Sequence, residues 1–278
     1  KPLSALLRRP SPATETTRMA RLAVAGLAFL LPQSQALIHS QRSEGDNLDD
    51  CKCLNWADVY KGHNVTCGAG MELFWAMDSM NSGIDNRVRY KMTLGSASAA
   101  ASAALQKLKG SEAYASFCTD FFEKASFNYC VNKRFLTEPD KVEISKGTWC
   151  YVSNKCRLPL SSAVPGTDLT AKQCTESLDP SLGSLAVEDV VKLAVEQGLD
   201  QIMLAGHAYL FKPVMVEELS ENQLRDLKDR SRPTIVFSMK DATAPRWVVE
   251  RESIYEYLYD ADHPQHWKVT CKSGCTSQ

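Results

Sequence analysis

Cysteine is the residue type in this chain whose number and spacing could support chemistry. Of the 278 residues 10 are cysteine; eight of these lie between residues 51 and 174, and the other two lie near the C-terminus. A cysteine can attack as a thiolate, bind a soft metal ion or pair in a disulfide, and the compartment largely decides among these fates. The ten candidates are Cys51, Cys53, Cys67, Cys118, Cys130, Cys150, Cys156, Cys174, Cys271 and Cys275.

The N-terminal residues indicate an oxidising compartment. We interpret residues 1–36 as upstream residues followed by a signal peptide that starts at Met19 and is cleaved after Ala36. Arg21 supplies a positive start, and residues 22–31 form an apolar stretch of ten. This stretch is shorter than the roughly 20 residues that a membrane-spanning helix needs. The mature protein is therefore expected in the secretory pathway, extracellular or lumenal, without a transmembrane segment.

In such a compartment the cysteines are expected to form disulfides, each of which stabilises the folded chain by roughly 2 to 4 kcal/mol. Ten cysteines allow about 945 pairings, so the connectivity is not predicted. Cys51 and Cys53 are separated by one residue and are expected to have different partners. Cys271 and Cys275 are expected to close a small loop through Gly274.

A zinc site is the alternative for the C-terminal pair. His263, His266, Cys271 and Cys275 follow one another at spacings of three, five and four residues, which a tetrahedral zinc site could accept. The signal peptide favours the disulfide, because zinc-binding thiolates belong mainly to reducing compartments. We therefore expect no metal and no cofactor, and zinc stays the alternative.

Motifs elsewhere give no support for catalysis. The sequence has no glycine-rich phosphate loop, nucleophile elbow, His-Glu-x-x-His helix, acidic calcium loop or Cys-x-x-Cys pair. His207 lies in an apolar helical stretch and is expected to be a buried structural histidine. The net charge of -1 gives no reason to expect nucleic acid as a partner.

One modification site is expected on the secretory route. Asn64, Val65 and Thr66 form an N-glycosylation sequence, which makes Asn64 the candidate glycan acceptor. The mature protein is therefore expected to be a glycoprotein.

The elements that must position these residues divide the mature chain into three parts. Residues 37–50 are polar and are expected to form a tail. Residues 51–174 are expected to be a cysteine-rich, disulfide-stapled domain. Residues 175–278 are expected to be a helical region with a short β pair and a cysteine-closed tail. The predicted fold class is mainly α with minor β, disulfide-rich.

Apolar residues at steps of three and four predict the helices. One begins after Ser111 and carries a buried stripe of phenylalanines that ends at Ala125, which is more typical of core than of a lipid or pigment pocket. Residues 95–104, rich in Ala and Ser, are also expected to be helical. Further helices are predicted over residues 185–197, over residues 199–211 before Pro213, and after the Ser220 and Gln223 capping box.

The β pair is predicted from residues 234–239 and 246–249, which flank a turn. Residues 254–259 form an aromatic cluster that is expected to pack against the preceding helices.

The chain resembles a family of secreted, cysteine-rich dinoflagellate proteins. The motifs are Cys51-x-Cys53-Leu54-x-Trp56, the Asn-Tyr-Cys-Val-Asn step at residues 128–132 and Trp-Cys-Tyr-Val-Ser at residues 149–153. The likeness covers roughly residues 51–204. That family has no assigned activity, so the resemblance implies a disulfide-bonded extracytoplasmic module.

A more distant resemblance is to the kringle, a disulfide-rich binding module that shares the Asn-Tyr-Cys and Trp-Cys-Tyr steps. Kringles that bind lysine carry an Asp-x-Asp pair between those cysteines, whereas this chain has Glu138-Pro139-Asp140-Lys141 there. Trp149 and Tyr151 of the shared segment could form a recognition surface, but packing over a disulfide is the preferred interpretation.

These observations favour a non-enzymatic, disulfide-stabilised secretory or lumenal protein that acts by binding a protein partner or by building an assembly. One alternative is a lumenal accessory subunit of a membrane complex, for instance a photosynthetic one in a plastid lumen. Another alternative is an enzyme, either a thiol oxidoreductase or a hydrolase.

Overall fold

The computed structural model of the chain describes residues 48–73, 109–138, 147–158, 161–238, 240, 244–260, 262 and 267–275. All of them belong to one compact unit, residues 43–278. The predicted signal peptide, most of the predicted polar tail and the Ala- and Ser-rich stretch over residues 95–104 lie outside the described residues.

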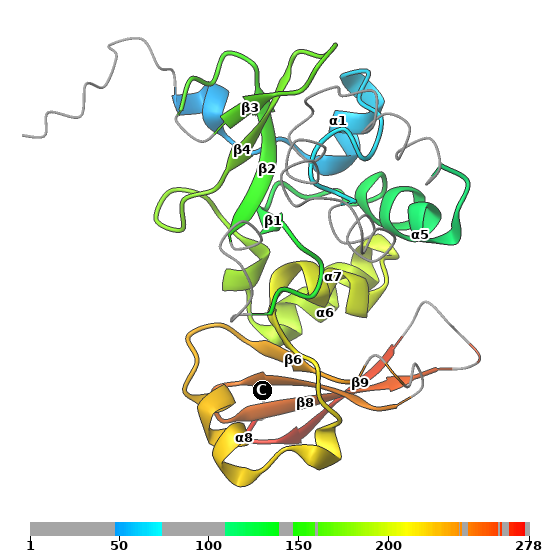
Figure 1. Ribbon diagram of the computed structural model, residues 1–278, viewed down its shortest axis with the longest axis vertical. Helices are drawn as coiled ribbons and strands as arrows, with labels where there is room; N and C mark the ends of the chain where they lie inside the picture. Colours follow the sequence, from blue (N-terminus) through cyan, green and yellow to red (C-terminus); the bar gives the residue numbers. More distant parts are fainter. Residues whose placement is uncertain are drawn as a thin grey trace, which may run out of the picture. The chain divides into compact units, whose positions relative to one another are not determined.

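The predicted fold class, mainly α with minor β, is wrong, because the described residues contain nine strands in two sheets (Figure 1). The first sheet is antiparallel and has the order β1-β2-β4-β3. Its strands are β1 (Val131–Asn132), β2 (Thr148–Ser153), β3 (Ser161–Ala163) and β4 (Leu169–Gln173). The second sheet has the order β5-β6-β7-β8-β9. Its strands are β5 (Leu210–Lys212), β6 (Thr234–Val236), β7 (Arg246–Glu250), β8 (Ser253–Tyr259) and β9 (Trp267–Ser273).

The helices of the described residues are short. The α-helices are α1 (Trp56–Gly62), α5 (Glu112–Tyr114), α6 (Val187–Gln197), α7 (Gln201–Ala208) and α8 (Glu221–Lys228). A π-helix, η2 (Ala115–Phe122), continues α5. Three 3-10 turns are η1 (Leu48–Cys51), η4 (Leu182–Ser184) and η5 (Val216–Glu218).

Local sequence signals explain where several elements begin and end. The Ser111 side chain accepts a hydrogen bond from the Tyr114 amide at the start of α5, as predicted. Gly198 ends α6 with φ of 63°, a left-handed conformation that glycine adopts without steric cost. The predicted capping box of Ser220 and Gln223 is present at the start of α8.

Two segments of the second region differ from the prediction. Residues 199–211 were expected to be one helix, but α7 ends at Ala208, and β5 follows and pairs in parallel with β6. Residues 254–259 lie in strand β8. The predicted packing of their aromatic side chains on the preceding helices is present, because Tyr255 and Tyr257 are buried in the core with α6 and the Tyr255 hydroxyl donates to Glu188 of α6. The predicted pairing of β6 with β7 is confirmed and is antiparallel.

One hydrophobic core contains residues of both sheets and of the helices beside them. Trp56 and Trp149 belong to it in the first half of the chain, and Tyr209 and Tyr257 belong to it in the second half. A side-chain hydrogen bond of 2.9 Å from Asn132 Nδ2 to the Tyr209 carbonyl also joins the two halves. The cysteine-rich half and the C-terminal half therefore share their core.

His207 of α7 is buried in the aromatic part of this core. Its ring stacks on Phe121 at 4.6 Å between centroids, and further phenylalanine rings surround it. Its Nδ1 lies 2.9 Å from the Met203 carbonyl oxygen. Because burial disfavours the charged form, the pKa of His207 falls from 6.5 to about 4.

This burial predicts a loss of stability in mild acid. The unfolded chain binds a proton at His207 below pH 6.5 and the folded chain does so only below about pH 4, so stability falls as the pH drops through this window. Between pH 7 and pH 5 the protein should lose about 2 kcal/mol of unfolding free energy through this residue. Urea unfolding at both pH values should show that His207→Leu removes this loss. A matched His63→Leu variant should still lose this stability between pH 7 and pH 5. An equal loss of unfolding free energy in the unaltered protein and in His207→Leu would contradict the role given to His207.

Candidate functional site

All ten cysteines lie in five disulfides. The pairs are Cys51–Cys156, Cys53–Cys150, Cys67–Cys118, Cys130–Cys174 and Cys271–Cys275. Cys51 and Cys53 have different partners, as their spacing predicted. The C-terminal pair closes its loop through Gly274, whose φ is 73°. No thiolate is therefore available for nucleophilic attack in this state.

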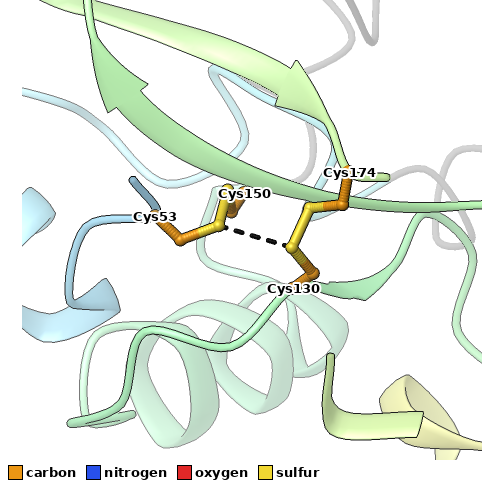
Figure 2. A group of neighbouring side chains, drawn as sticks. All are labelled: Cys53, Cys130, Cys150 and Cys174. Carbon is orange, nitrogen blue, oxygen red and sulfur yellow. Dashed lines mark hydrogen bonds between the residues drawn. A yellow bond between two sulfur atoms is a disulfide. The ribbon is translucent and has the colours of Figure 1, made fainter. Parts of the chain in front are cut away.

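Two of these disulfides touch in the core (Figure 2). Cys53 Sγ and Cys130 Sγ are 3.3 Å apart, although they belong to different disulfides. Neither sulfur carries a proton, so this is a van der Waals contact rather than a hydrogen bond. The sulfurs of Cys53, Cys130, Cys150 and Cys174 all lie within 4.8 Å of one another. Three of these cysteines are buried, and Cys174 is half-buried.

A cavity of about 410 Å³ reaches this pair of disulfides at Cys174. Its lining comes from both sheets and includes Asn132, Thr148, Cys174, Glu176, Leu210 and Arg232. A second cavity of about 260 Å³ shares part of this lining, including Arg232. Because the Cys130–Cys174 disulfide joins the residues before β1 to the end of β4, it fixes one wall of the larger cavity.

Arg232 is the cationic side chain in the described lining of this cavity. Its Nη2 donates to Asn132 Oδ1 at 2.9 Å and to the Ala208 carbonyl at 2.6 Å. A Cβ atom at position 183 would overlap the guanidinium, so Gly183 makes room for it. Burial lowers the pKa of Arg232, and the charge of Glu176 raises it. A guanidinium held in this way is suited to bind a carboxylate, whose two oxygens match its planar N–H groups.

Lys172 of β4 is a buried cation that the sequence did not single out. Its Nζ donates to the Cys51 carbonyl at 2.7 Å and to Asp179 Oδ1 at 2.6 Å. Lys172 stands opposite Cys150 in the register of β2 and β4, so the two side chains share one face of the sheet. The ion pair therefore anchors β4, which ends one residue before Cys174.

Trp149 and Tyr151 are not a recognition surface, because they expose only 0% and 1% of their area. They pack against Trp56, with ring centroids 4.9 and 5.6 Å away. The Tyr151 hydroxyl donates to buried Glu72 at 2.6 Å, and the Tyr60 hydroxyl donates to it at 2.8 Å. Burial raises the pKa of Glu72, and these hydrogen bonds oppose the rise. Residues 149–151, the Trp-Cys-Tyr step on which both resemblances rest, are thus part of the core.

The remaining predicted site residues lie apart from the cavity. Asn64 is exposed with φ of 52°, and Thr66 of the same glycosylation sequence is also exposed. Cys271 and Cys275, the cysteines of the zinc alternative, are joined in a disulfide, and His263 and His266 lie outside the described residues.

Five disulfides indicate that the chain folds in an oxidising compartment. Among the residues that the structure describes, no helix has the length and apolar character needed to span a membrane. The chain matches no protein-family model, no curated protein and no solved structure.

The buried ion pair of Lys172 predicts a large effect of removing one partner. Lys172→Met should lower the unfolding free energy by about 3 kcal/mol, because it leaves Asp179 Oδ1 and the Cys51 carbonyl without the ammonium donor. Lys52→Met is the matched control, since Lys52 pairs with Asp49 at the surface and should change stability little. Urea unfolding measures both, and equal effects would contradict the assigned role.

Proposed function

We propose that the chain is a non-enzymatic secretory or lumenal protein that acts by binding a protein partner. The observation that carries the proposal is the closure of all ten cysteines in disulfides, which leaves a stabilised scaffold and no thiolate nucleophile. The resemblance to secreted dinoflagellate proteins and the signal peptide predicted from the sequence support the secretory route.

The cavity beside Cys174 supports binding as the activity. A disulfide fixes one of its walls, so little conformational entropy is lost when a partner group enters. Arg232 provides a partly desolvated cation there beside the Glu176 carboxylate, and a carboxylate is the group that complements the guanidinium. The partner we propose therefore presents an acidic side chain or a C-terminal carboxylate to this cavity.

Capture with an arginine variant tests the proposed binding site. Protein immobilised in its oxidised form should retain its partner from the native secretory fraction, and Arg232→Gln should reduce retention at least about tenfold by removing a charge-assisted hydrogen bond. Arg225→Gln is the matched control, because Arg225 is an exposed arginine of α8. Near-ultraviolet circular dichroism checks that both variants fold.

Two results would contradict this proposal. Equal retention by the protein and both variants would remove the cavity as the binding site. Turnover of a hydrolase or oxidoreductase substrate that one point substitution abolishes would show that the protein is an enzyme.

The exposed sequence at Asn64 tests the secretory route. Chain produced through a eukaryotic secretory pathway should carry a glycan at Asn64 that an endoglycosidase removes, seen as a mass shift. Thr66→Ser preserves the acceptor sequence and should keep the glycan, whereas Thr66→Ala should lose it. An unmodified Asn64 in protein recovered from the medium would contradict the expected glycoprotein.

A further inference from the structure

The two touching disulfides are arranged so that they can exchange partners. Their present pairs are Cys53–Cys150 and Cys130–Cys174. The other possible pairs are also close, because Cys53 Sγ lies 3.3 Å from Cys130 Sγ and all four sulfurs are within 4.8 Å. Among the described residues, these four cysteines form a group whose sulfur atoms all lie close to one another.

The strand register also favours the second new pair. Cys150 of β2 stands opposite Lys172, and Cys174 lies two residues beyond Lys172 at the end of β4. Cys150 and Cys174 are therefore diagonal neighbours on one face of the sheet, where side chains of adjacent strands can meet. The sulfurs of the alternative pairs are thus already near neighbours, within 4.8 Å of each other.

Access to the pair is through Cys174. It is the half-buried member of the four, and it lines the cavity of about 410 Å³ that also contains Arg232. Of the four cysteines, Cys174 is the one in the described lining of this cavity, so a small thiolate that enters the cavity approaches the pair of disulfides at this residue. A carboxylate on the same molecule can be held by Arg232.

We propose that Cys174 is the point of attack for a small thiol that carries a carboxylate, and that this attack switches the two disulfides to Cys53–Cys130 and Cys150–Cys174. The site lies in the cavity of the proposed function, but the exchange goes beyond binding and does not depend on a protein partner.

Three displacements complete the exchange. The thiolate attacks Cys174 Sγ, forms a mixed disulfide there and expels Cys130 as a thiolate. The Cys130 thiolate attacks Cys53 Sγ, which forms Cys53–Cys130 and expels Cys150. The Cys150 thiolate attacks Cys174 Sγ, forms Cys150–Cys174 and releases the original thiolate. Each step breaks one S–S bond and forms another, so the number of disulfides and the oxidation state are unchanged.

The variant Cys174→Ser tests the central displacement without any added thiol. It leaves Cys130 as a thiol beside Cys53, so exchange should transfer the free thiol to Cys150. The oxidised variant is held at pH 8, quenched in acid, unfolded and labelled with N-ethylmaleimide, and labelled peptides are quantified by mass spectrometry. Label on Cys150 at one tenth or more of that on Cys130 supports the proposal. Label confined to Cys130 overturns it.

Cys67→Ser is the matched control. It frees Cys118, which is equally buried and lies outside the group of four sulfurs, so label should stay on Cys118. Label spread over many cysteines in either variant would indicate unfolding and scrambling, and it would overturn a site-specific exchange.

The unaltered protein keeps the proposal testable if the variants do not fold. Incubation with 3-mercaptopropionate should produce peptides linked by Cys53–Cys130 and Cys150–Cys174, whereas neither cysteine of the accessible Cys271–Cys275 disulfide should become linked to another cysteine of the chain. If Cys53–Cys150 and Cys130–Cys174 are still the only pairs of these four cysteines after hours with the thiol at pH 8, the proposed switch is overturned. Per thiolate, 3-mercaptopropionate should react at Cys174 about tenfold faster than neutral 2-mercaptoethanol. Equal rates would show that Arg232 does not recognise the carboxylate of the thiol. The exchange itself is tested separately by Cys174→Ser.

Discussion

The contact between two buried disulfides is the constraint on which the rest of the structure depends. Cys53–Cys150 joins the segment before α1 to β2 across 97 residues, and Cys130–Cys174 joins the residue before β1 to the residue after β4 across 44 residues. Bonds that close such long loops restrict the unfolded chain and offset the loss of entropy on folding. Short strands such as β1 could not hold these segments together by hydrogen bonds alone. The disulfides therefore place the strands, and the strands then define the cavity.

Buried polar groups near the two disulfides have hydrogen-bond partners from distant segments, which only folding brings together. Lys172 lies between the Cys51 carbonyl and Asp179, and Glu72 accepts hydrogen bonds from two tyrosine hydroxyls. A buried charge lowers the free energy of unfolding unless it has hydrogen-bond or ion-pair partners. These groups therefore favour the one fold that provides their partners. Arg232 differs in lining a cavity as well as bonding to the backbone, and this is why we assign it a role in recognition.

Local signals in the sequence were sufficient for elements with clear ends, such as α6 with Gly198 and α8 with its capping box. They failed for β9, which is an edge strand with a largely exposed, polar sequence. For β8 the Tyr-rich sequence favours a strand, but it was interpreted only as an aromatic cluster. The spacing of the cysteines predicted that Cys51 and Cys53 differ in partner but could not give the pairs, which depend on strand register. Arg232 and Lys172 carried no motif, since their roles arise from segments distant in the chain.

The account depends most directly on the state of the sulfurs in the native protein. Thiol titration of freshly isolated protein under denaturing conditions without reductant, followed by mapping of linked peptides, measures that state. We predict no titratable thiol among the ten cysteines, with Cys53 and Cys130 each bonded within their group of four. Ten free thiols, or a stoichiometric zinc ion held by these cysteines, would contradict the account.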